Sequence, residues 1–174
     1  MLTELIVKDY AIAHALEVEW RCGMTAITGE TGAGKSILLD AIGLALGDRA
    51  DPEAIATNAD RAEISVRFDV ARIASAKTWL TEHGFPDDEQ QVLLKRIILR
   101  EGRSRAWING QPATLAQLKE IGETLIDIHS QHEHQSLLKR ESHAQLLDSF
   151  GQQSEQVKAV QLLTRQWKSL QQEI

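Results

Sequence analysis

One short stretch near the N-terminus combines glycines, a lysine and a serine at a spacing suited to phosphate chemistry. It consists of Gly29, Glu30, Thr31, Gly32, Ala33, Gly34, Lys35 and Ser36. Glycines allow a loop to turn several backbone N–H groups inward around phosphate oxygens. The Lys35 ammonium can contact the β- and γ-phosphates, and the Ser36 hydroxyl can ligate Mg²⁺. This pattern predicts that the chain binds a nucleoside triphosphate of the ATP type together with Mg²⁺.

The elements on either side of this loop fit the same chemistry. Residues 24–28 read as a short strand that enters the loop, and residues 36–46 carry apolar side chains at helical spacing. Gly47 is the expected stop of that helix. Because the helix begins at the loop, its partly positive N-terminal end would face a bound anion.

The rest of the chain reads as a mixture of strands and helices. Strands are expected at residues 2–7, 15–20, 63–68, 92–99, 106–108 and 124–128, and helices at residues 71–83 and 115–121. The pair Asn109-Gly110 is a strong signal for a hairpin turn. The pattern therefore predicts an α/β fold built around a phosphate-binding loop.

Hydrolysis needs a further acidic group, usually at the end of an apolar strand, to help hold the metal. Asp127 and Asp69 are the candidates for this position, but both follow short or interrupted apolar runs. A structural role at the edge of a strand suits Asp127 better. We therefore expect the catalytic acid to be absent from this chain.

Composition narrows the class of protein. The chain has 174 residues, 43% of them hydrophobic, and a net charge of −6. No apolar run approaches the roughly 20 residues that cross a bilayer, and no secretory signal is visible. Cys22, the single cysteine, is expected to be a buried or half-buried thiol in a reducing compartment. Overall charge does not indicate a nucleic-acid partner, which would need a local basic patch.

The last stretch has the apolar spacing of a coiled coil. Its apolar positions alternate by three and four and comprise Val160, Leu163, Trp167, Leu170 and Ile174. Only about two heptads are visible, so an amphipathic helix that packs on its own domain remains an alternative. Because the pattern is still running at the last residue, we expect the chain to be part of a longer one.

Five segments together carry a resemblance to a known family: residues 2–20, 28–36, 44–50, 108–111 and 128–135. They resemble the bacterial RecN family of DNA double-strand-break repair ATPases, which is related to structural-maintenance-of-chromosomes (SMC) proteins. The resemblance covers nearly the whole chain, and the unusual run His-Ser-Gln-His-Glu-His-Gln at residues 129–135 makes it specific.

This resemblance implies the N-terminal half of an ABC/SMC-like ATPase head at residues 1–150, followed by the start of a coiled-coil arm at 151–174. It also implies that Gln131 contacts Mg²⁺ and the attacking water, and that Arg49 lies near the phosphates. In the family, the remaining catalytic groups belong to the C-terminal half. We therefore expect this chain alone to bind ATP without turnover.

The resemblance further implies partners. These are the chain's own C-terminal half, a second copy that joins on ATP binding, and DNA held by the complete protein. The implied location is the cytoplasm, at the bacterial nucleoid, with no membrane contact.

Two polar clusters each admit two interpretations. His129, His132 and His134, with Glu133, could ligate a metal, although their spacing matches no closed zinc pattern; the alternative is a polar loop near the nucleotide. A second cluster, beside Trp107, comprises Lys95, Arg96, Arg100, Arg103 and Arg105. It could contact a phosphate backbone, or it could be a solvated, salt-bridged hairpin. For the four scattered tryptophans we expect packing rather than base stacking.

Two other functions remain open from the residues alone. One is a self-contained kinase that transfers phosphate to a small molecule, although this leaves the heptad spacing unexplained. The other is a non-enzymatic, nucleotide-dependent binding module.

Overall fold

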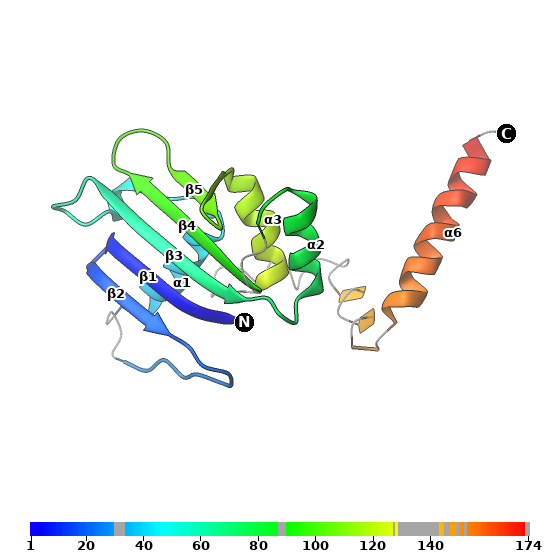
Figure 1. Cartoon of the computed structure of the whole chain (residues 1–174), viewed down its shortest axis with the longest axis horizontal. Helices are drawn as coiled ribbons and strands as arrows, with labels where there is room; N and C mark the ends of the chain where they lie inside the picture. Colours follow the sequence, from blue (N-terminus) through cyan, green and yellow to red (C-terminus); the bar gives the residue numbers. More distant parts are fainter. Residues whose placement is uncertain are drawn as a thin grey trace. The chain divides into compact units, whose positions relative to one another are not determined.

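The computed structural model describes residues 1–29, 34–86, 90–126, 128, 143–144, 147–148, 150–151 and 153–172. The chain divides into two compact units, Met1–Ile128 and His129–Ile174. Figure 1 shows the whole chain, and each unit is described by itself. The boundary between head and arm expected near residue 150 stays a prediction.

Within the described part of the first unit, six strands form one antiparallel sheet (Figure 1). They are β1 (Leu2–Tyr10), β2 (Ala13–Glu19), β3 (Arg61–Asp69), β4 (Gln91–Leu99), β5 (Arg105–Ile108) and β6 (Gln111–Ala113). Their order across the sheet is β2-β1-β3-β4-β5-β6. Alternate side chains of β3 and β4 are buried, as expected where one face of a sheet covers a core.

Helices cover the apolar face of this sheet. They are α1 (Lys35–Ala45), α2 (Ala74–Glu82) and α3 (Leu115–Leu125), and a short 3₁₀ turn, η1, spans Pro52–Ala54. Helix α1 packs on β1, β3 and β4 and lies behind the sheet in Figure 1, whereas α3 contacts α2 and β5. Burial of Ile64, Leu94, Leu118 and other apolar side chains between these layers stabilises the unit.

The hairpin predicted at Asn109-Gly110 is confirmed between β5 and β6. Both residues have positive φ angles, 46° and 79°, as the tight hairpin turn requires. The Asn109 side chain also accepts a hydrogen bond from the backbone N–H of Leu93, at 2.7 Å. This contact ties the turn to β4.

Two predicted strands are wrong. Residues 24–28 form no strand, because no described strand pairs with them and a strand is stable only with a hydrogen-bonded neighbour. The strand predicted at 124–128 is replaced at its start by the end of α3. That helix is longer than predicted because Leu118, Ile121 and Leu125 continue the helical spacing of buried residues.

The second unit contains helix α6 (Ser154–Gln172). Its apolar side chains are largely exposed: Val160 62%, Leu163 63%, Trp167 60% and Leu170 60%. Both alternatives, a coiled-coil arm and an amphipathic helix that packs on its own domain, stay predictions. Among the helices that the structure describes, none is long and apolar enough to span a membrane.

Candidate nucleotide-binding site

The predicted phosphate loop ends at the N-terminus of α1. Gly34 caps the helix with φ 89° and ψ 6°, a left-handed conformation that glycine adopts at little cost. The first turn of α1 contains no acidic residue, so its partly positive end is not neutralised from within the helix. Residues 30–33, which include Glu30, Thr31, Gly32 and Ala33, lie outside the described residues.

Lys35 joins the two described ends of the loop. Its Nζ donates a hydrogen bond to the backbone carbonyl oxygen of Gly29. Ser36, the expected Mg²⁺ ligand, lies next to it in the first turn of α1 and is exposed. Lys35 and Ser36 therefore lie at the N-terminal end of α1 with Gly29 beside them, and their contacts with phosphate and Mg²⁺ stay predictions.

A pocket of about 420 Å³ opens beside Lys35. It is lined by Ile12, Ala13, His14, Ala15, Leu16, Ile27, Thr28, Gly34, Lys35, Ile37 and Leu38. Pockets for small molecules typically measure about 300–1,000 Å³, so this one is of suitable size for part of a nucleotide. The sequence did not single out the turn between β1 and β2 as part of this pocket, because the contact depends on how that turn packs.

The other predicted site residues have different positions. Arg49 is exposed in the segment that follows α1. Gln131, Asp127 and the cluster at residues 129–134 (His129, His132, Glu133 and His134) lie outside the described residues. Asp69 accepts a hydrogen bond from the backbone N–H of Ala71 at 2.8 Å, which is a turn-closing structural role.

The structure separates the members of the basic cluster, for which the sequence left two interpretations open. Lys95 pairs with Glu63, and Arg96 is only 1% exposed, so it cannot reach a phosphate backbone from the surface. Arg100 donates hydrogen bonds to backbone carbonyls, among them that of Ala56 at 2.9 Å. Arg103 and Arg105 remain exposed. The alternation of β4 was the missed signal, since Arg96 shares a face with Val92, Leu94 and Ile98.

The aromatic and cysteine side chains add two findings. Trp79 stacks on His83 at 4.0 Å between ring centroids and on Phe85 at 5.7 Å. The packing role expected for Trp79 is therefore confirmed, whereas Trp167 is 60% exposed. Cys22 is exposed, and its predicted burial is wrong because it lies in residues 21–29, a segment without helix or strand in which every residue is exposed.

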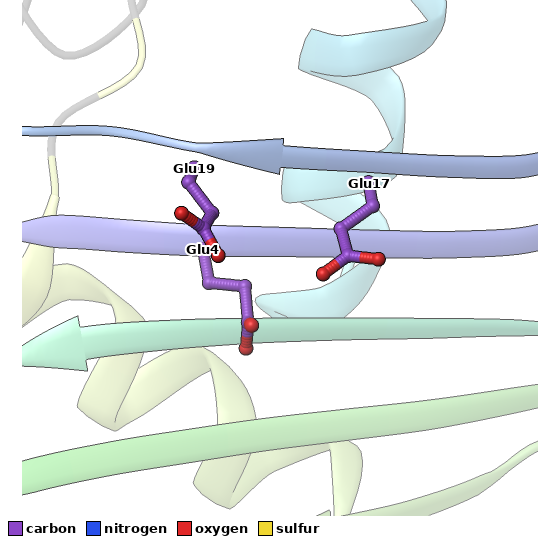
Figure 2. Close-up of side chains that lie close together, drawn as sticks. All are labelled: Glu4, Glu17 and Glu19. Atoms are coloured by element: carbon purple, nitrogen blue, oxygen red, sulfur yellow. The ribbon is translucent and has the colours of Figure 1, made fainter.

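Three carboxylates that the sequence did not bring together meet on the exposed face of β1 and β2. Figure 2 shows Glu4, Glu17 and Glu19, whose carboxylate oxygens lie within 4.8 Å of one another. The strand register, which pairs Glu4 with Glu19, creates this cluster. Arg67 donates to Glu4 at 3.1 Å and offsets part of the repulsion.

Comparison with known proteins assigns the class. The AAA domain family matches residues 4–174, and the chain belongs to this family. The chain is also 45% identical over 170 residues to the DNA repair protein RecN of Xylella fastidiosa strain Temecula1. It is 40% identical over 168 residues to RecN of Vibrio cholerae. The resemblance to RecN inferred from the sequence is confirmed.

These matches cover 98% and 97% of this chain but 30% of each relative. The chain thus spans less than a third of the length of the RecN proteins that it matches.

Solved structures agree with this class. The SMC head bound to the C-winged helix domain of ScpA is 29% identical, with a TM-score of 0.55, over 71% of this chain and 40% of that one. A chain from a study of ATP-driven dimerization and DNA-stimulated activation of SMC ATPases has a TM-score of 0.60 and 24% identity, covering 86% and 98% of the two chains. The predicted fold, an α/β P-loop domain of the SMC-head type, is confirmed.

Proposed function

We propose that this chain is the nucleotide-binding half of an ATPase head in a RecN-type DNA repair protein. ATP would bind with its phosphates in the loop of residues 29–36, against the N-terminus of α1. Lys35 would contact the β- and γ-phosphates, and Ser36 would ligate Mg²⁺. Arg49 would approach the phosphates from the segment after α1.

The observation that carries the proposal is the contact of Lys35 with Gly29 across the loop. The ammonium of Lys35 thus lies beside Gly29, the last described residue before the loop, and Lys35 is the first residue of α1, whose N-terminal end is partly positive. An anionic phosphate could replace the carbonyl as its partner. The pocket of about 420 Å³ beside Lys35 offers room for the rest of the nucleotide.

Hydrolysis would require groups from outside this chain. Gln131 would contact Mg²⁺ and the attacking water. The remaining catalytic groups would come from the protein's own C-terminal half. The exposed segment at residues 24–28 supports this division, because Met24 is fully exposed and Ile27 is 48% exposed. Strands supplied by a second half would cover them.

ATP binding would then join two heads into a homodimer and so control how the complete protein holds DNA. A structural neighbour from work on ATP-driven dimerization and DNA-stimulated activation of SMC ATPases supports this step. A ligand that binds the joined state more tightly shifts the population toward it. Such a protein would act in the cytoplasm, at the nucleoid.

The test measures ATP binding and ATP turnover by this chain in parallel, with Lys35→Ala as the variant. Lys168→Ala, which removes an exposed lysine from α6, is the matched control. We expect binding without turnover, and loss of binding in Lys35→Ala alone. Equal binding by the parent and Lys35→Ala would contradict the proposed site.

Turnover by this chain alone would instead favour a self-sufficient enzyme, such as the kinase alternative. Turnover by neither this chain nor the complete protein would favour the nucleotide-dependent binding module.

A further inference from the structure

Arg96 is a charged side chain buried in the core of the first unit. It is 1% exposed and extends from the apolar face of β4, between Leu94 and Ile98. Its Nη1 donates hydrogen bonds to the carbonyl oxygen of Leu44, at 2.7 Å, and to that of Asp48. Leu44 lies in the last turn of α1, and Asp48 precedes Arg49. One guanidinium group therefore connects β4 to the end of α1 and to the segment that follows it.

A contribution to the stability of the fold does not by itself explain why Arg96 is buried. Burial lowers the pKa of Arg96, although the Asp48 carboxylate opposes this shift. Its Nε is buried and has no hydrogen-bond partner among the residues that the structure describes, which carries a further cost. Replacing a buried charged group by an apolar one of similar size is often neutral or even stabilising. The directed contacts of Nη1 therefore point to a role in positioning.

Arg100, just beyond the end of β4, makes a second set of contacts with the same connection. Its Nη2 donates to the carbonyl oxygens of Ala56, at 2.9 Å, and Ala59, at 3.0 Å. Its Nε also donates to Ala59, at 3.1 Å. These carbonyls lie between η1 and β3. The two arginines thus hold the α1–β3 connection, defined as residues 46–60, near its beginning and near its end.

The α1–β3 connection in turn supports the turn between β1 and β2. The backbone N–H of Ala56 donates to the carbonyl oxygen of Asp9, at 2.9 Å, and that of Ala11 donates to Ala54, at 2.6 Å. The next residues along the chain, beginning with Ile12, line the pocket beside Lys35. Neither arginine lines that pocket itself, so an effect on it would pass through the connection or, for Arg96, also through α1.

We propose that Arg96 and Arg100 are positioning residues for the nucleotide site. From β4 they fix the α1–β3 connection, which carries Arg49 and supports one wall of the Lys35 pocket. This inference rests on the proposed function, since it assigns the arginines to the ATP site rather than to DNA. It takes the place of the DNA contact that was one of the two interpretations of these residues from the sequence.

The test uses the complete protein with Arg96→Met and Arg100→Met, which keep an apolar stem and remove the guanidinium. Arg103→Met is the control for charge, because Arg103 is exposed in the next turn. Leu94→Ala is the control for core packing, because Leu94 is fully buried on the same face of β4. Binding of a fluorescent ATP analogue, KM, kcat and the melting temperature are measured for each variant.

We expect both methionine variants to raise Kd and KM by about threefold to tenfold, with a smaller change in kcat. Leu94→Ala should lower the melting temperature more than Arg96→Met does and leave Kd nearly unchanged. Arg96→Lys should recover part of the affinity, because an ammonium group can still donate to the two carbonyls. Hydrogen exchange should accelerate at residues 46–60 in both methionine variants.

If Arg96→Met and Arg100→Met both bound ATP with the same Kd as the parent, the proposal would be overturned. An equal loss of affinity in Leu94→Ala would also overturn it, since the effect would then follow stability. If the parent and Lys35→Ala bound ATP equally weakly, the proposed function would fail and the role of the arginines at the nucleotide would fall with it. Unchanged exchange at residues 46–60, with a parent that binds ATP, would overturn the positioning role alone.

Discussion

The Nζ of Lys95 lies 3.0 Å from Oε2 of Glu63, on the exposed face of the sheet where β3 and β4 pair. Arg61 approaches the other oxygen of the same carboxylate, at 2.9 Å. The hydrogen bond from Lys95 is the main reason that the pKa of Glu63 lies below its usual value, and the charges of Lys95, Arg61 and Lys8 add to it against the cost of burial. Part of the apparent basic cluster is therefore a local ion pair of the sheet.

This ion pair predicts how stability depends on pH. A carboxyl group whose pKa is lowered by folding stabilises the folded state above its unfolded pKa, and this contribution is lost as pH falls through the folded pKa. Lys95→Met should therefore lower the free energy of unfolding by about 0.2–1 kcal/mol at neutral pH. The difference from the parent should disappear at acid pH. Urea unfolding at several pH values measures it.

Lys119→Met, which removes an exposed lysine from α3, is the control and should show no such pH dependence. A difference between Lys95→Met and the parent that stayed constant down to acid pH would show that Glu63 is not the partner responsible.

A second prediction concerns DNA. Arg96 is buried, and Lys95 and Arg100, although they reach the surface, are engaged with Glu63 and with backbone carbonyls. Arg103 and Arg105 are the exposed members of the cluster between β4 and β5. We expect Arg103→Glu together with Arg105→Glu to leave the DNA affinity of the complete protein and its salt dependence nearly unchanged. Binding titrations at several salt concentrations measure both quantities.

Two lost phosphate contacts would instead reduce the slope of log K against log salt by about 1.8. That result would show that Arg103 and Arg105, in the hairpin between β4 and β5, contact DNA. A double charge reversal at Arg21 and Arg72, which are exposed elsewhere on the first unit, controls for the change in net charge.

A third prediction compares two glycines. Gly47 has φ 106°, and a Cβ added there would lie 2.8 Å from the carbonyl oxygen of Leu115. Gly102 has a similar φ of 98°, but a Cβ there would meet nothing within 4 Å. Both alanine variants should lose about 1–2 kcal/mol of stability through backbone strain. Gly47→Ala should lose about 1–3 kcal/mol more, because α1 ends in close contact with the start of α3.

Thermal or urea unfolding of the two variants gives the comparison directly. Equal losses of stability would mean that small backbone shifts relieve the contact between the Cβ added at position 47 and the carbonyl oxygen of Leu115.

Local patterns explain what could be predicted from the sequence. The alternation in β3 and β4, the helical spacing of α1 and the Asn109-Gly110 turn each depend on a few neighbouring residues. The phosphate loop was recognisable for the same reason, because Gly34, Lys35 and Ser36 are adjacent in the chain.

What could not be predicted depends on tertiary partners. Arg96 looked like a surface charge beside Lys95, and only the packing of α1 against β4 shows that its guanidinium faces the Leu44 carbonyl. Glu4 and Glu19 are far apart in the chain, and the register of β1 on β2 brings them together. The strand predicted at residues 24–28 needs a neighbouring strand that the described residues do not supply.

The last prediction follows from that missing neighbour. If the C-terminal half completes the sheet, residues 24–28 should become a strand in the complete protein, and the exposed side chains of Met24 and Ile27 should be covered. Backbone N–H groups in a paired strand exchange slowly with solvent, whereas those in an exposed segment exchange fast. We expect hydrogen exchange at 24–28 to be fast in this chain and markedly slower in the complete protein, while β3 and β4 are protected in both. Equal, fast exchange at 24–28 in both proteins would show that the remaining half does not pair with this segment, and the composite head would lose its main structural support.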